Sequence, residues 1–241
     1  MWRMNYTIVM NLPRLPKILE TMHRMADRPD LYPEQEAYDY VRNVVVRLMK
    51  KTGCIRTECF GKENLPPEGG YVLYPNHQGK YDAYSIIDVH ESSLTAVMDR
   101  EMSYFVLIDE IIRTLRGKRM DISNARQALT VINAVAEEVM AGRRYIIFPE
   151  GGYDDKKRNR LWDFKPGSFK AATKAGVPIV PVVLVDSYKV YNSWQLTPVK
   201  TQVHFLEPLY AEDYQNLNTT QIAQEVKARI RTKLTQLGFE E

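Results

Sequence analysis

The sequence lacks several features that define whole classes of protein. Its 241 residues include only two cysteines, Cys54 and Cys59, with no array of His and Cys around them. This scarcity argues against a disulfide framework and against a zinc site, and it indicates a reducing compartment. We interpret both cysteines as small buried hydrophobic residues and not as reactive thiols.

Long apolar runs are also missing. No stretch approaches the roughly 20 uninterrupted apolar residues that a helix needs to cross a bilayer. Asn5, Asn11 and Arg14 interrupt the N-terminal apolar residues, so no secretory signal is predicted. The formal net charge of +3 is too small to indicate a general nucleic-acid binder. We therefore expect a cytoplasmic protein that binds no nucleic acid, with contact to a membrane surface still open.

After Gly53, short apolar runs alternate with longer segments of helical periodicity. Strands are predicted at Ile55–Phe60, Tyr71–Tyr74, Leu94–Met98, Arg144–Phe148, Ile179–Val185 and Gln202–Leu206. Helices are predicted at about 80–90, 101–116, 124–141, 167–175 and 220–237. This order predicts an α/β fold with a mostly parallel central sheet flanked by helices. Ligands of such sheets bind beyond the carboxyl ends of the strands.

Residues 1–52 are predicted to form an N-terminal helical pair ahead of a main domain at 53–241. Apolar residues recur at helical spacing, first at Leu15, Ile18, Leu19 and Met22 and then at Val41, Val44, Val45, Leu48 and Met49. Pro33 can open the second helix and Gly53 can end it. Two interpretations stay open. The pair packs on the main domain, or it anchors the protein to a membrane surface by an apolar face beside basic residues.

The segment from Tyr74 to Asp82 is the most informative one, because it follows a predicted strand directly and contains a histidine and a carboxylate. His77 and Asp82 are five positions apart, a spacing that puts two side chains on different faces of a regular helix or strand. The two can meet only across a turn, for which Gly79 supplies a permissive backbone. Asp82 would then fix the tautomer of His77 and leave the other ring nitrogen as a base. The alternative is a surface loop that only caps a helix.

Two further segments carry groups suited to an anionic substrate. Glu150 and Gly151 follow a predicted strand, where the carboxylate could hold a hydroxyl or a cation, or simply lie in water. Basic residues cluster on both sides of them, at Arg113, Arg116, Lys118 and Arg119 and at Lys156, Lys157, Arg158, Arg160 and Lys165. Arginine suits a phosphate monoester by bidentate contact. We interpret most of the lysines as solvated and single out Arg119 for its position.

A nearly continuous apolar run from Gly176 to Leu184 contains Pro178 and Pro181. Because proline cannot donate a hydrogen bond to a sheet, the two mark the start of a strand and an edge or bulge. The run is interpreted as core, and an apolar wall close to the site could also face an acyl chain.

Four ordered blocks together resemble the glycerolipid acyltransferases, and among them most of all the 1-acylglycerol-3-phosphate (lysophosphatidic acid) acyltransferases. The blocks are Asn76-His77-Gln78 with Asp82, Arg119-Met120-Asp121, Phe148-Pro149-Glu150-Gly151 and Val177-Pro178-Ile179-Val180-Pro181. The stretch Phe164–Phe169 also resembles what usually follows the third block, and the resemblance runs from about residue 55 to 235. Each block alone is unspecific, whereas four in this order are specific.

The resemblance implies an acyltransferase domain at 53–241 that makes phosphatidic acid from a lysophospholipid acceptor. It implies that His77 is the general base and that Asp82 supports it. It also implies that Arg119, Glu150 and Gly151 hold the glycerol phosphate. The acceptor hydroxyl would attack the donor thioester directly, since no serine or cysteine in the blocks is an obvious nucleophile.

The fourth block, around Pro178 and Pro181, is associated by the same resemblance with the acyl donor. The donor would be acyl-CoA or acyl carrier protein, with no bound cofactor and no metal, and the protein would associate peripherally with the inner face of the cell membrane. Gly79, Lys80 and the pair Gly152-Tyr153 depart from the commoner family residues, which leaves the acceptor open. The alternatives are an acyltransferase for another glycerol-phosphate or lysophospholipid acceptor, and a non-catalytic peripheral lipid-binding protein.

Overall fold

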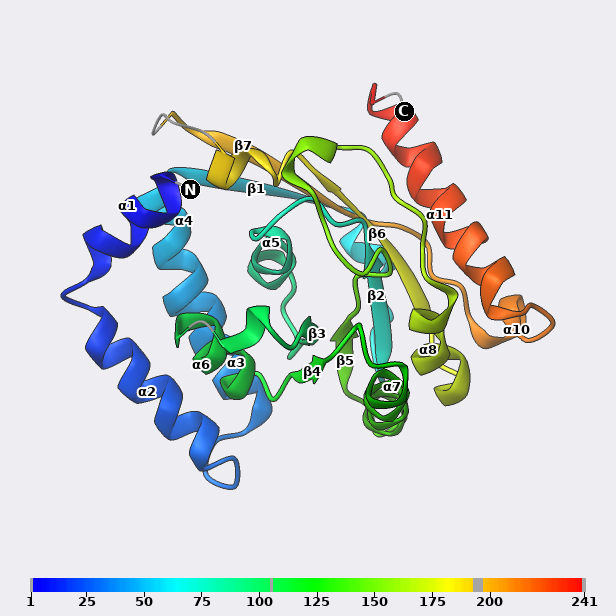
Figure 1. Ribbon diagram of the computed structural model, residues 1–241, viewed down its shortest axis with the longest axis horizontal. Coiled ribbons are helices and arrows are strands. Elements are labelled where there is room, and N and C mark those ends of the chain that lie inside the picture. The colour runs from blue at the N-terminus through cyan, green and yellow to red at the C-terminus, as the bar shows by residue number, and fades with distance from the viewer. Residues whose placement is uncertain (1, 105, 193–196, 240–241) are drawn as a thin grey trace.

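The computed structural model describes residues 2–104, 106–192 and 197–239 (Figure 1). Within them, seven strands form one sheet in the order β1-β7-β6-β2-β5-β3-β4. The strands are β1 (Ile55–Phe60), β2 (Tyr71–Pro75), β3 (Thr95–Asp99), β4 (Lys118–Met120), β5 (Arg144–Ile146), β6 (Ile179–Val185) and β7 (Val199–Phe205). Neighbouring strands run parallel except β6 and β7. The predicted fold class is confirmed.

Helices cover both faces of the sheet. One layer holds α7 (Ala125–Met140), α8 (Lys170–Ala175), the short α10 (Ala211–Tyr214) and α11 (Thr219–Gln236). The other layer holds α2 (Leu15–Asp27), α3 (Glu34–Tyr40), α5 (Asp82–Val89) and α6 (Val106–Thr114). On β2, Val72 and Tyr74 pack into the first layer while Tyr71 and Leu73 pack into the second. Because both faces of the central strands are buried, their sequences are continuous apolar runs.

The N-terminal helices are present and pack on the second layer. A π-helical segment, Val41–Val46, joins α3 to α4 (Arg47–Gly53), and it buries Val41 and Val45 in the core that also contains Ile18 and Met22 of α2. α1 (Trp2–Asn11) is fixed by the buried Arg3, which donates to the carbonyl oxygens of Gly53 and Thr197. Among the residues described, no helix is both long and apolar enough to span a bilayer.

The prolines of the fourth block lie where the sequence places them. Pro178 precedes β6, and Pro181 lies inside it, paired with Tyr74 of β2. On its other side, β6 pairs with the chain segment 205–209. Val182 pairs with Phe205, and Ile179 pairs with Leu209. Between these two pairs, the segment 205–209 advances four positions while β6 advances three. The extra residue is a bulge beside Pro181, which has no N–H to donate. The predicted strand start is confirmed, and of the two alternatives for the prolines, an edge or a bulge, the structure has the bulge.

Some local predictions were wrong. β4 is missing from the predicted strands because it is three residues long and mostly polar, which leaves no apolar pattern to read. The predicted helix at 101–116 divides into a short 3-10 turn at Met102–Tyr104 and α6. Cys54 is exposed, because it ends α4 in the left-handed conformation with φ 52°, and Cys59 is only half-buried.

A buried histidine beside the N-terminal layer makes the fold sensitive to acid. His90 is 1% exposed, its Nε2 lies 2.6 Å from Tyr71 Oη, and its Nδ1 lies 2.8 Å from the Ser92 carbonyl oxygen. Burial lowers the pKa of His90 to about 4. The unfolded chain takes up this proton below pH ~6.5, so the stability that the neutral ring contributes is complete above that pH and is lost as pH falls toward 4.

We predict that His90→Gln flattens the pH dependence of stability. The wild type should lose about 2 kcal/mol more of its unfolding free energy between pH 7 and pH 4.5 than the variant, as integration over the two pKa values requires. Urea denaturation at several pH values measures this difference. Met140→Ser, at an exposed residue that does not titrate, should keep the wild-type slope. Equal slopes for wild type and His90→Gln would contradict the assignment.

Candidate active site

The turn between β2 and α5 holds the predicted histidine and aspartate. His77 Nδ1 lies 2.7 Å from Oδ2 of Asp82, whose side chain is fully buried at the first residue of α5. The same oxygen accepts the backbone N–H groups of Gln78, at 2.5 Å, and Gly79, at 2.9 Å. A carboxylate that accepts these bonds requires a proton on Nδ1, so Nε2 of His77 carries the free lone pair of a base. The two side chains meet across a turn, as the spacing predicts.

The other oxygen of Asp82 faces a residue that sequence reasoning missed. Ser187, two positions after β6, donates its hydroxyl to Oδ1 of Asp82, and its backbone N–H donates to Oε1 of Gln78 at 3.0 Å. Gln78 in turn donates to Asn159 Oδ1 and to the Leu184 carbonyl oxygen, both at 2.7 Å. The network ties the end of β6 to the turn. The only available signal was the rule that ligands collect at the carboxyl ends of strands.

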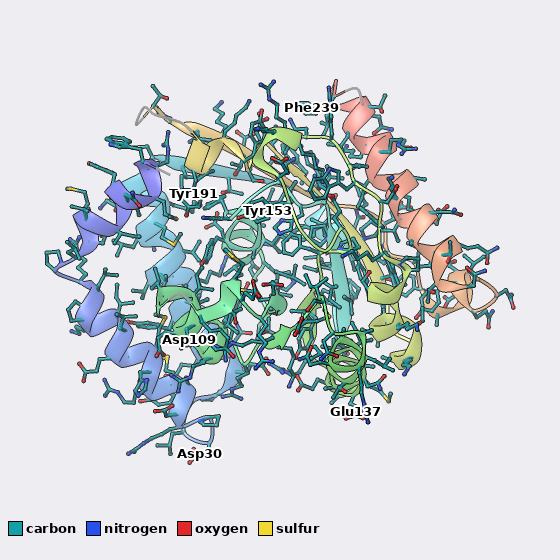
Figure 2. The ribbon with its side chains drawn as sticks, viewed as in Figure 1. Asp30, Asp109, Glu137, Tyr153, Tyr191 and Phe239 are labelled. Carbon is teal, nitrogen blue, oxygen red and sulfur yellow. The ribbon has the colours of Figure 1, made fainter. Side chains whose placement is uncertain are left out.

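Aromatic side chains enclose the histidine ring. The ring stacks on Phe148 with centroids 4.0 Å apart and lies 4.7 Å from the ring of Tyr153, which Figure 2 labels beside α5. The side chain of His77 still keeps 17% of its surface exposed. Because Phe148 follows β5, the ends of β2, β5 and β6 meet around one base with an open edge. Such a base can reach the proton of a bound substrate.

Glu150 lies behind His77, with its side chain fully buried. Its Oε1 accepts the backbone N–H of His77 at 3.1 Å, and its Oε2 accepts the backbone N–H of Trp162 at 3.3 Å and an ion pair from Lys157. Lys157 Nζ also donates to the His77 carbonyl oxygen at 3.1 Å. Both carboxylate oxygens are therefore already bonded to the protein.

Lys157 differs from the solvated lysines with which the sequence analysis grouped it. Its side chain is only 2% exposed, and Nζ lies 5.1 Å from the ring centre of Trp162. Burial lowers the pKa of its ammonium to about 7, an effect that the charge of Asp82 opposes. Most of the lysines were interpreted as solvated, and Lys157 was not singled out, because two neighbouring lysines in a sequence give no sign of which one is buried.

Gly151 completes the turn after β5. Its φ is +68°, a conformation that L-residues rarely adopt, and a Cβ there would lie 2.5 Å from Lys165 Nζ. Its N–H donates to the Phe148 carbonyl oxygen at 3.2 Å. The glycine is thus required by the turn itself, and its contact with a substrate stays a prediction.

Arg119 lies on β4, separated from β2 in the sheet by β5 and β3. Its Nε donates to Ser103 Oγ at 3.0 Å, its guanidinium forms an ion pair with Asp109, and its Cζ lies 5.0 Å from the ring centre of Tyr104. The side chain is 27% exposed. Its role toward phosphate stays a prediction.

The other basic residues of the upstream cluster have structural partners. Lys118 pairs with Glu138, Arg113 pairs with Asp27 and Glu110, and Arg116 donates to the carbonyl oxygens of Pro29 and Tyr32. The side chain of Arg119 contacts Ser103, Tyr104 and Asp109 instead. These partners account for the three neighbours, and the choice of Arg119 as a site residue stays a prediction.

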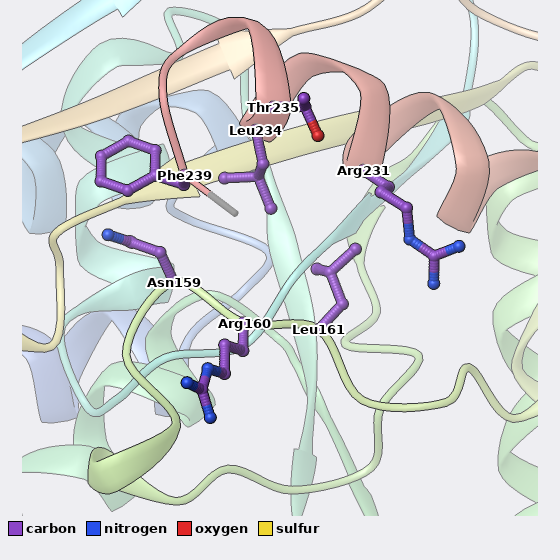
Figure 3. Close-up of a pocket in the computed structure, with 7 residues that line it drawn as sticks. All are labelled: Asn159, Arg160, Leu161, Arg231, Leu234, Thr235 and Phe239. Atoms are coloured by element: carbon purple, nitrogen blue, oxygen red, sulfur yellow. The ribbon is translucent and has the colours of Figure 1, made fainter. Parts of the chain in front are cut away.

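A shallow recess lies between the segment Asn159–Leu161 and α11, with Arg160 and Arg231 at its rim (Figure 3). Phe239 and Leu234 form its apolar side. It marks where the segment after Glu150 packs on α11. His77 does not line it, whereas Asn159 lines it and also accepts the hydrogen bond from Gln78. Across the described ranges, no three His, Cys, Asp or Glu side chains converge as a metal site requires.

Comparison with known proteins places this geometry in context. A family model described as Acyltransferase matches residues 56–185, which is more than half of the chain and spans all four blocks. A Salmonella typhimurium protein named 1-acyl-sn-glycerol-3-phosphate acyltransferase is 26% identical over 188 residues, covering 77% of this chain and 76% of that protein. A Saccharomyces cerevisiae protein of the same name is 24% identical over 187 residues, covering 74% and 60%.

A solved structure is similar over almost the whole chain. The crystal structure of the 1-acyl-sn-glycerophosphate (LPA) acyltransferase PlsC from Thermotoga maritima superposes with a TM-score of 0.75 at 20% sequence identity. The match covers 99% of this chain and 97% of that one. At this identity the likeness establishes a shared fold, N-terminal helices included.

Proposed function

This chain belongs to the acyltransferase family, and we propose that it moves a fatty acyl chain from a thioester donor to the free hydroxyl of 1-acylglycerol-3-phosphate, giving phosphatidic acid. The observation that carries the proposal is the buried Asp82, which holds the Nδ1–H of His77 and leaves Nε2 free. The names of the relatives from Salmonella typhimurium and Saccharomyces cerevisiae support the choice of acceptor.

In the proposed reaction, Nε2 of His77 takes the proton of the acceptor hydroxyl as its oxygen attacks the thioester carbonyl carbon. The tetrahedral intermediate collapses, the C–S bond breaks, and the imidazolium returns the proton to the leaving thiolate. Asp82 stays ionised and stabilises the imidazolium through the Nδ1 bond. General-base catalysis of this kind contributes typically ~10²–10⁴-fold. Acyl-CoA and acyl carrier protein both supply the required thioester, and no bound cofactor takes part.

The phosphate of the acceptor is proposed to bind Arg119. A phosphate offers an arginine two parallel, charge-assisted hydrogen bonds, whereas the partly exposed Asp109 offers a solvent-screened ion pair. Pro178 and Pro181 are proposed to lie on the side of the acyl donor, as the family resemblance implies.

The first prediction of this proposal concerns His77→Ala. Transfer of a radiolabelled acyl chain to lysophosphatidic acid should fall ~10²–10⁴-fold, because the base is gone. The assay uses acyl-CoA and acyl carrier protein as separate donors, and His23→Ala, at an exposed histidine, is the control. Full activity in His77→Ala would refute the mechanism. If the wild type transferred the acyl chain only to another lysophospholipid, that lysophospholipid would be the acceptor. If it transferred the chain to no acceptor, the result would favour a non-catalytic lipid-binding protein.

A second prediction separates Arg119 from its neighbour. Arg119→Ala should raise the KM for lysophosphatidic acid ~10-fold or more and leave the donor KM within about twofold, since a charged hydrogen bond contributes about 1.5–3 kcal/mol. Lys118→Ala removes a positive charge one residue away that pairs with Glu138, and it should leave both constants near wild type. A change confined to the donor KM would show that Arg119 does not hold the acceptor phosphate.

The protein is also proposed to work on a membrane surface, at the turn between α1 and α2 that projects at the left edge of Figure 1. Three apolar side chains there are strongly exposed: Val9 by 59%, Met10 by 51% and Leu12 by 53%. The exposed Arg14 and Lys17 follow directly. Apolar side chains beside basic ones suit an anionic lipid surface.

The triple change Val9→Ser, Met10→Ser and Leu12→Ser tests this placement. It should weaken binding to phosphatidylglycerol vesicles at least ~10-fold, because each buried CH₂ contributes about 0.8 kcal/mol to membrane binding. Cosedimentation measures the effect, and Met140→Ser, at the exposed end of α7, is the matched control. Deleting residues 1–52 would be a poor substitute, since it removes core residues. Equal binding by wild type and triple variant would leave the N-terminal helices with a packing role only.

A further inference from the structure

The main chain of His77 is held by a buried ion pair. Both of its backbone polar groups are bonded to this pair, the N–H to Glu150 at 3.1 Å and the carbonyl oxygen to Lys157 at 3.1 Å. Because Lys157 also pairs with Glu150, the three residues form a closed ring of hydrogen bonds. We name this arrangement, Glu150 and Lys157 together, the main-chain clamp.

The clamp is closed to substrate. The side chains of Glu150 and Lys157 are 0% and 2% exposed, and the second oxygen of the carboxylate also accepts the Trp162 N–H at 3.3 Å. A hydroxyl or a phosphate of the acceptor would have to displace protein donors from a buried charge, which is costly. The contacts of Glu150 therefore favour a role inside the protein over the acceptor contact that the family resemblance implies.

We infer that Glu150 and Lys157 are positioning residues that fix the main chain of His77, while Asp82 fixes its ring. This inference rests on the proposed role of His77 as the general base. Two independent sets of bonds then determine where Nε2 lies. The need for both is physical, since a displacement of about 1 Å between reacting groups can cost ~10²-fold in rate.

The clamp also joins the segment after β5 to the base. Lys157 ends a short 3-10 turn, Asp155–Lys157, that follows Tyr153, whose ring packs on His77. The contact of Lys157 with Glu150 and the contact of Tyr153 with the ring of His77 are therefore made by one short segment. Lys157, which the sequence did not distinguish from the neighbouring lysines, thus connects this segment to the candidate base.

The test compares Glu150→Gln, Lys157→Met and the double variant, with Lys156→Met as a control at the exposed neighbouring lysine. Each single change leaves one buried charge without its partner and can lower stability, whereas the double variant leaves none. The double variant is therefore the decisive one once its thermal melt shows that it is folded. Its kcat should fall ~10–100-fold, while the KM values for lysophosphatidic acid and for the donor stay within about twofold of wild type.

A spectroscopic readout separates this inference from the proposed function. With four histidines in the chain, selectively labelled histidine gives few imidazole signals, and His77→Ala identifies the Nδ1–H that is bonded to Asp82. That signal should shift or broaden in the double variant and stay unchanged in Lys156→Met. An unchanged signal with wild-type kcat would overturn the positioning role. A rise of ~10-fold or more in the acceptor KM with kcat retained would instead make Glu150 an acceptor ligand.

Full activity of His77→Ala would defeat the proposed function, yet the imidazole signal of the clamp variants would still report whether the clamp positions His77. The two ideas can therefore fail separately.

Discussion

The carboxylate of Asp82 is the group on which the site depends, because a buried charge persists in a fold only when its lone pairs are satisfied. Four donors meet it: the ring Nδ1–H of His77, the backbone N–H groups of Gln78 and Gly79, and the hydroxyl of Ser187. Its place at the first residue of α5 adds the positive end of the helix dipole. The shape of the β2–α5 turn follows from this requirement, and so does the tautomer of the histidine.

The order of the strands places residues from distant parts of the chain near Asp82 and His77. β2 lies between β6 and β5, and all three run parallel, so their carboxyl ends share one edge of the sheet. Ser187 comes from beyond β6, and Glu150 comes from beyond β5. Strands that are apolar on both faces and packed between two helical layers provide a rigid base for these polar contacts. The site is therefore polar only at the tips of an apolar sheet.

Sequence reasoning succeeded where the signal was local or strongly apolar. Buried strands such as β6 were predicted because both of their faces are apolar. The contact between His77 and Asp82 was predicted because the two lie only five positions apart, between a strand and a helix. The partners of the pair could not be found this way. Ser187 reaches Asp82 across 105 positions and Lys157 reaches His77 across 80, and no periodicity records such contacts. The sequence also contained no indication that the side chain of Glu150 points toward the main chain of His77.

The two residues proposed to act on the substrates, His77 and Arg119, are held by interactions of different strength. His77 is fixed by buried hydrogen bonds from the turn itself, from beyond β5 and from beyond β6, so its position changes only if several of them break together. Arg119 and Asp109 are each 27% exposed, and an ion pair screened by solvent contributes little. Asp109 lies on α6, whose Arg113 and Glu110 contact Asp27 and His23 of α2. Through Asp109, Arg119 is therefore connected to α6, which contacts the N-terminal helix α2. Because its ion pair with Asp109 contributes little, Arg119 can exchange this partner at small cost. Under the proposed function, a base that is fixed in advance and an arginine that exchanges its carboxylate for the acceptor phosphate suit a two-substrate transfer.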